Sequence, residues 1–205
     1  MSKKTLIPFV LRPHDSSGTW ESNDARYRAY AHELLDQLEK LTAEIHKKWP
    51  KGVISITDKT KYPELWKLTR IRDRTSDNAR IYAAMAVEGF LNFYGVLRLG
   101  QKVFDEHFER LSLIQKLQRL ILISESIVIS QQDPLVKTLE SIAKGRNSLV
   151  HPKALEIKDS SKRTSTNIPD VAKKAVDGME SFFKQFALAV PAMLNHIDTG
   201  TKLNL

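Results

Sequence analysis

The chain has 205 residues, of which 41% are hydrophobic and 27% are charged. This composition is sufficient to build the core of one globular domain and excludes a wholly disordered chain. Because the chain has no cysteine, a disulfide scaffold, a thiolate zinc site and a cysteine nucleophile are excluded. No apolar run has the length needed to cross a bilayer, and the start does not resemble a signal peptide. These features predict a soluble cytoplasmic protein.

The formal net charge of the chain is +8 at neutral pH. An excess of positive charge favours polyanionic partners such as RNA or DNA, because binding releases counterions. Many basic proteins bind no nucleic acid, however, so the charge alone leaves both possibilities open.

The first quarter of the chain divides into an arm and a long helix. Residues 1–22 contain two prolines and a cluster of turn-forming residues, which predicts an extended N-terminal arm. Residues 23–48 repeat leucine and isoleucine at steps of three and four, which predicts a first helix. Residues 53–60 alternate weakly and favour either a short strand or a loop.

Two helices with different apolar content are expected in the next segment. Residues 63–74 begin with proline and predict a short helix. Ser76 or Asp77 is expected to cap a separate and strongly apolar helix, which Gly100 ends. Residues 101–108 follow as a short segment before the next apolar run.

The second half of the chain also has a helical period. Residues 111–124 are apolar on most faces and predict a helix. A cap-forming aspartate followed by proline predicts another over 133–150. Residues 153–168 are polar and predict a loop, and a last helix over 169–197 is expected to kink at Pro191.

The predicted fold class is therefore all-α, a bundle of about five main helices with little or no strand. One helical domain is expected over residues 23–198, between the arm at residues 1–22 and a short tail at residues 199–205.

The segment KGRNSLVHPK, residues 144–153, carries the candidate catalytic residues. Arg146 and His151 would diverge on an ideal helix, but Pro152 disfavours helical geometry at the residue before it. His151 is therefore expected to leave the helix end and return toward Arg146. Asn147 offers an amide that can orient either side chain or a phosphate.

These residue types suit cleavage of RNA without a metal ion. A histidine can take the proton of the attacking ribose 2′-hydroxyl. A guanidinium can bind two oxygens of the phosphorane-like transition state. One histidine cannot easily serve both sides of an in-line displacement, so a homodimer that joins two copies of the segment is expected.

The Arg-Asn-x3-His pattern from Arg146 to His151 resembles the signature of HEPN domains, helical domains named for nucleotide binding in prokaryotes and higher eukaryotes. Residues 83–95 resemble an earlier helix of that family, and residues 114–121 resemble the basic amphipathic helix between the two. The resemblance covers roughly residues 25–195.

The resemblance implies a dimeric helical bundle with the two motifs at the subunit interface. Many HEPN domains are metal-independent endoribonucleases in toxin–antitoxin, abortive-infection and related defence systems, and some lack nuclease activity. It implies catalytic roles for Arg146 and His151 and a positioning role for Asn147. Glu88 would match an acidic residue that steadies the arginine, or it would be a structural ion-pair member.

Basic residues on and after the motif helix are candidates for RNA contact, although a flexible solubilising loop explains most of them equally well. They are Lys144, Lys153, Lys158, Lys162 and Arg163. Arg80 and the basic run over residues 70–74 either follow an RNA backbone or form a solvated helix face.

Other functions remain open in the sequence. A non-catalytic dimeric module could bind a nucleotide, RNA or a protein partner such as an antitoxin or a nucleotidyltransferase. A DNA-binding regulator is less favoured, because no helix-turn-helix segment is apparent. No metal-ligating spacing or glycine-rich phosphate loop is found, so neither a metal nor a cofactor is expected.

Overall fold

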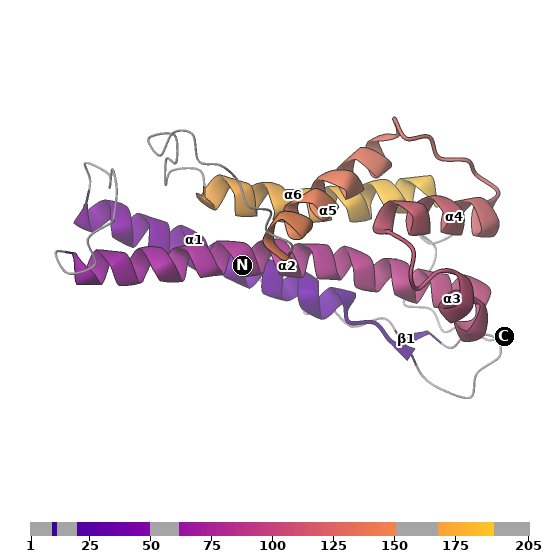
Figure 1. The fold of residues 1–205 in the computed structure, drawn as a ribbon, viewed down its shortest axis with the longest axis horizontal. Coiled ribbons are helices and arrows are strands. Elements are labelled where there is room, and N and C mark those ends of the chain that lie inside the picture. Colours follow the sequence, from indigo (N-terminus) through magenta and orange to yellow (C-terminus); the bar gives the residue numbers. More distant parts are fainter. Residues whose placement is uncertain (1–9, 12–19, 50–61, 151–167, 191–205) are drawn as a thin grey trace.

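The computed structural model describes residues 10–11, 20–49, 62–150 and 168–190, and most of these residues are helical (Figure 1). The prediction of an all-α bundle with little or no strand is confirmed. Two-residue strands, β1 and β2, pair antiparallel within the predicted arm. The elements are β1 (Val10–Leu11), β2 (Trp20–Glu21), α1 (Asp24–Lys48), α2 (Pro63–Leu99), α3 (Gln101–His107), α4 (Leu113–Glu125), α5 (Pro134–Val150) and α6 (Ile168–Ala189).

The long helix α2 is the centre of the bundle. It packs against each of the other helices, most extensively against α1 and α6. Figure 1 shows α5 and α6 along one side of the long α1–α2 pair, with α3 and α4 near one end. The helix α5 packs on both α2 and α6, and its end lies beside the middle of α2, where Arg80 bonds the carbonyl oxygen of Gly145.

The core between α2 and α6 is aromatic. The ring of Phe90 on α2 meets Phe182, Phe183 and Phe186 of α6 edge to face, at centroid separations of 6.3, 5.2 and 5.0 Å. Tyr94, one turn further along α2, contacts Phe186 at 5.1 Å in the same manner. These geometries are favourable for aromatic pairs and add to the burial of apolar surface. The three phenylalanines of α6 therefore form a packing surface against α2.

The predicted break before residue 77 is wrong, since α2 is continuous from Pro63 to Leu99. The hydroxyl of Ser76 is buried and donates a hydrogen bond to the carbonyl oxygen of Ile168, at 3.1 Å. Asp77 accepts a hydrogen bond from Arg80 one turn later, at 3.4 Å. Both side chains have partners that leave the helix backbone intact, so neither acts as a cap.

Several predicted helix ends are confirmed. Gly100 ends α2 with a φ of 80°, a conformation that glycine adopts without strain. The Asp133 carboxylate accepts a hydrogen bond from the backbone N–H of Leu135 at 2.8 Å, at the start of α5. Predictions for residues 53–60, for the loop after residue 150 and for the kink at Pro191 lie outside the described residues.

A capping box starts α4, and the sequence reasoning did not predict it. The side chain of Ser112 accepts from the backbone N–H of Gln115, and the side chain of Gln115 accepts from the backbone N–H of Ser112. Such reciprocal bonds satisfy two donors at a helix start. No described helix is long and apolar enough to span a membrane.

Candidate functional site

Arg146 lies in the penultimate turn of α5 and faces the middle of α2. Its Nη2 atom lies 3.6 Å from the Oε2 atom of Glu88, and the two side chains are 35% and 34% exposed. The separation is longer than a hydrogen bond, so the pair is a loose ion pair. The structure thus brings together two of the residues that the sequence singles out, from positions 58 apart in the chain.

A buried lysine lies in the same polar region between α2 and α4. Lys116 of α4 is 1% exposed, and its Nζ atom donates to the Oδ1 atom of Asn92 at 2.6 Å and to the carbonyl oxygen of Glu109 at 3.4 Å. Asn92 is one turn after Glu88 on α2. Burial lowers the pKa of Lys116, and the nearby charges of Glu88 and Glu109 only partly offset that effect.

Lys116 is a residue that the sequence reasoning missed. The spacing of Lys116 in the sequence could have identified it, because it lies three residues after Leu113 and four before Leu120, both of which are buried. A charged residue at apolar helical spacing is predicted to point into the bundle, where it needs a polar partner. Asn92 supplies that partner in the structure.

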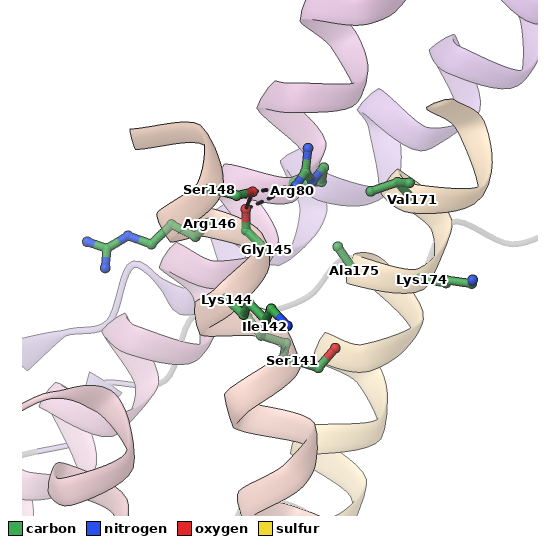
Figure 2. Close-up of a pocket in the computed structure, with 10 residues that line it drawn as sticks. All are labelled: Arg80, Ser141, Ile142, Lys144, Gly145, Arg146, Ser148, Val171, Lys174 and Ala175. Carbon is green, nitrogen blue, oxygen red and sulfur yellow. Dashed lines mark hydrogen bonds between the residues drawn. The ribbon is translucent and has the colours of Figure 1, made fainter. Parts of the chain in front are cut away.

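A pocket of about 300 Å³ opens between the C-terminal half of α5 and the N-terminal half of α6 (Figure 2). We call it the α5–α6 pocket. Four of the described residues that line it are cationic and none is acidic, but Figure 2 shows the charged ends of Arg146 and Lys174 extending away from it. The lining residues are Arg80, Ser141, Ile142, Lys144, Gly145, Arg146, Ser148, Val171, Lys174 and Ala175.

Arg80 joins α2 to the end of α5 at this pocket. Its Nη2 atom donates to the carbonyl oxygen of Gly145 at 3.0 Å and to the hydroxyl of Ser148 at 3.1 Å. Its Nη1 atom donates to the carboxylate of Asp77 at 3.4 Å. With its side chain only 14% exposed, Arg80 is a fixed part of the wall.

The guanidinium of Arg146 points away from the α5–α6 pocket. Figure 2 shows it extending from the side of α5 opposite Val171, Lys174 and Ala175. Its contact with Glu88 therefore lies on a different face of α5 from the pocket. The end of α5 has two basic faces, one with Arg146 and one with the pocket.

The remaining predicted site residues separate into two groups. Asn147 and Lys144 lie on the exposed surface of α5, and Lys144 also lines the pocket. The other group lies outside the described residues and comprises His151, Lys153, Lys158, Lys162 and Arg163. The approach of His151 to Arg146 therefore remains a prediction.

The basic run on the first half of α2 does not form a continuous surface. Arg72 is buried, and it bonds the carboxylate of Asp73 through Nη2 at 2.9 Å and through Nε at 3.2 Å. Arg70 and Arg74 are exposed on either side of it. Only part of the run can therefore meet a polyanion.

A second histidine–arginine group joins α1 to α6. Nε2 of His32 lies 2.8 Å from Oε1 of Glu180, and Arg28 donates from Nε to the same oxygen at 2.6 Å. Burial raises the pKa of Glu180, but the bonds from Arg28 and His32 outweigh it and hold that pKa below its usual value. This group serves as a link between the two helices.

Within the described ranges, no three histidine, aspartate or glutamate side chains gather in a way that could hold a metal ion. A comparison of the chain with protein-family models, with curated proteins and with solved structures finds no match in any of the three.

Proposed function

We propose that this protein is a metal-independent endoribonuclease of the HEPN type, acting as a homodimer on RNA. The observation that carries the proposal is the position of Arg146. It is half-buried beside Glu88, in the turn of α5 that leads directly to His151. An arginine that only compensated the negative end of its own helix would have no need of a carboxylate on α2.

The ion pair leaves Arg146 suited to bind a phosphate. At 3.6 Å, Glu88 orients the guanidinium by charge while the five N–H donors of the fork stay available to phosphate oxygens. Orientation of this kind lowers the cost of ordering a long side chain when the substrate binds.

In the proposed mechanism, His151 accepts the proton of the ribose 2′-hydroxyl as that oxygen attacks the adjacent phosphorus. Arg146 stabilises the negative charge that develops on the phosphoryl oxygens. The 5′-oxygen leaves and takes a proton from His151 of the second copy. Asn147 positions these groups, and the basic residues on both sides of the motif hold the RNA backbone.

A cleavage assay with purified full-length protein tests the proposal. The protein is incubated with a mixed RNA pool in the presence of a chelator, and the products are examined for 2′,3′-cyclic phosphate ends. We expect His151→Ala and Arg146→Ala each to slow cleavage by roughly a hundredfold or more. The matched controls are His46→Ala and Arg110→Ala, at exposed positions on α1 and after α3, and these should cleave as the wild type does.

Two results would contradict the proposal. One is wild-type protein that leaves all RNAs intact, and the other is a His151→Ala protein as active as the wild type. Loss of RNA binding on Arg146→Ala, with no cleavage by any form, would instead favour the non-catalytic dimeric module. If light scattering gives the mass of a monomer, no second His151 is available to protonate the leaving 5′-oxygen.

The cellular setting follows from the same proposal. An RNA-cleaving HEPN domain would act in the cytoplasm, in a toxin–antitoxin or defence system, and would need a partner that restrains it. An antitoxin or nucleotidyltransferase partner is the expected kind of protein.

A further inference from the structure

We propose that Lys116 is a positioning residue for Arg146, because the two cations share the carboxylate of Glu88. The buried lysine uses the charge of Glu88 from inside the bundle. Glu88 therefore holds Arg146 loosely and leaves its guanidinium available to an anion. The effect of Lys116 on RNA cleavage rests on the proposed function, whereas the sharing of Glu88 does not.

Three neighbouring helices bring these charges together. On α4, Nζ of Lys116 donates a hydrogen bond to Oδ1 of Asn92 at 2.6 Å. Asn92 lies four residues after Glu88, so the two side chains share one face of α2. Arg146 of α5 reaches the same face, where its Nη2 atom lies 3.6 Å from Oε2 of Glu88. One carboxylate is thus placed between a buried helix contact and the surface of the bundle.

The ammonium group of Lys116 needs a negative charge that its hydrogen bonds do not supply. Both acceptors, the side-chain amide of Asn92 and the carbonyl oxygen of Glu109, are neutral. Because Lys116 is buried, water does not compensate its charge. Burial lowers the pKa of Lys116, and the charge of Glu88 opposes that effect more than the charge of Glu109 does. Among the described residues, Glu88 is therefore its main counter-charge.

The second cation weakens the hold of Glu88 on Arg146. The positive charge of Lys116 repels the guanidinium and so offsets part of its attraction to Glu88. The separation of 3.6 Å is accordingly longer than a hydrogen bond. Exposure alone does not explain this distance. Arg28 and Glu180 are exposed to a similar extent, yet Nε of Arg28 donates to Oε1 of Glu180 at 2.6 Å.

A mutant cycle measured by urea unfolding tests the sharing without any cleavage. The coupling between Glu88→Gln and Arg146→Ala is determined in the wild type and again in Lys116→Met, which keeps a similar side-chain volume without the charge. Lys116→Gln is a second neutral variant, because its amide can still donate to Asn92. Arg119→Gln is the matched control, since it removes an exposed cation from the same helix. Far-UV circular dichroism establishes that each variant is folded.

In the wild type, we expect the pair to change the equilibrium constant of unfolding by about twofold. In Lys116→Met and Lys116→Gln, this coupling should rise to about tenfold, because Glu88 then serves Arg146 alone and can form a charge-assisted hydrogen bond with it. Arg119→Gln should leave the coupling at about twofold.

The proposed function adds a kinetic test with the full-length protein. The additional coupling must be given up when Arg146 binds a phosphate, so both neutral variants at Lys116 should lower kcat/KM for RNA cleavage by about fivefold. In the Glu88→Gln background, Lys116→Met should slow cleavage less than twofold, because Lys116 acts on Arg146 through Glu88. A purely structural role of Lys116 would slow cleavage equally in both backgrounds. Arg119→Gln should cleave as the wild type does.

The proposal is overturned if neutral variants at Lys116 leave the coupling between Glu88 and Arg146 unchanged, or if Arg119→Gln raises it as much. In a protein that cleaves RNA, it is also overturned if Lys116→Met slows cleavage equally with and without Glu88. Wild-type protein that cleaves no RNA would contradict the proposed function, and the unfolding cycle would then decide the role of Lys116.

Discussion

The close packing of α2 at Gly95 allows a quantitative test. A Cβ atom on Gly95 would lie 2.5 Å from two ring carbons of Phe104 and 3.1 Å from Cδ2 of Leu120. Both neighbours are buried, so neither can swing into solvent. A clash this short falls at the upper end of overpacking costs, about 3 kcal/mol. The better helix propensity of alanine offsets about 1 kcal/mol of this overpacking cost. Gly95→Ala should therefore lower the free energy of unfolding by about 2 kcal/mol.

The assay is thermal and urea unfolding followed by far-UV circular dichroism. For a chain of this size, a loss of that magnitude lowers the melting temperature by roughly 4–8 °C. Gly145→Ala is the matched control, because a Cβ there meets nothing within 4 Å. It should raise stability by about 0.5–1 kcal/mol through the helix term alone. A Gly95→Ala protein as stable as the wild type would refute the close packing of α2 on Phe104.

Three further predictions concern charged residues. Burial raises the pKa of Glu180, but hydrogen bonds from α1 outweigh it and hold that pKa below its usual value. Glu180→Gln should therefore lower the free energy of unfolding, measured in urea at neutral pH, by about 1 kcal/mol. The difference between the variant and the wild type should vanish as the pH falls through the folded-state pKa of Glu180. Burial lowers the pKa of Lys116 below 10.5, so the unfolded chain binds the proton more strongly. The free energy of unfolding of the wild type should therefore rise with pH between the folded-state pKa of Lys116 and 10.5. Unfolding curves measured at alkaline pH should show no such rise for Lys116→Met. A double-mutant cycle of Glu88→Gln and Arg146→Ala should give a stability coupling of about 0.5 kcal/mol for a pair this exposed. Under the proposed function, Glu88→Gln should also cleave RNA roughly tenfold more slowly. If neither the stability coupling nor the slower cleavage is seen, a positioning role for Glu88 is contradicted.

Helix ends were predictable from the sequence where the decisive interaction is local. The cap at Asp133 bonds a backbone group two residues away, and Gly100 ends α2 through its own backbone conformation. The prediction failed at Ser76, whose hydroxyl partner is the carbonyl oxygen of Ile168, 92 residues later in the chain. A serine before an apolar run is typical of a cap, and only the packing of α6 on α2 gives this one another role.

In the candidate site, too, local features were predictable from the sequence and contacts between distant segments were not. The types and spacing of residues near Arg146 follow from the sequence, and the link to Glu88 was expected only through a family resemblance. The α5–α6 pocket was not predicted, because its cations Arg80, Lys144 and Lys174 come from three helices and share no local pattern. The net charge is a property of the whole chain and cannot place the cations around one cavity.

Two arginines fix the last turns of α5 against α2, in opposite directions. Arg80 reaches from α2 to the backbone of Gly145 and the side chain of Ser148, and Arg146 reaches from α5 back to Glu88. The first contact builds one wall of the pocket, and the second orients the proposed catalytic guanidinium. The two contacts use different faces of α5, and the guanidinium of Arg146, a residue that also lines the pocket, extends away from it.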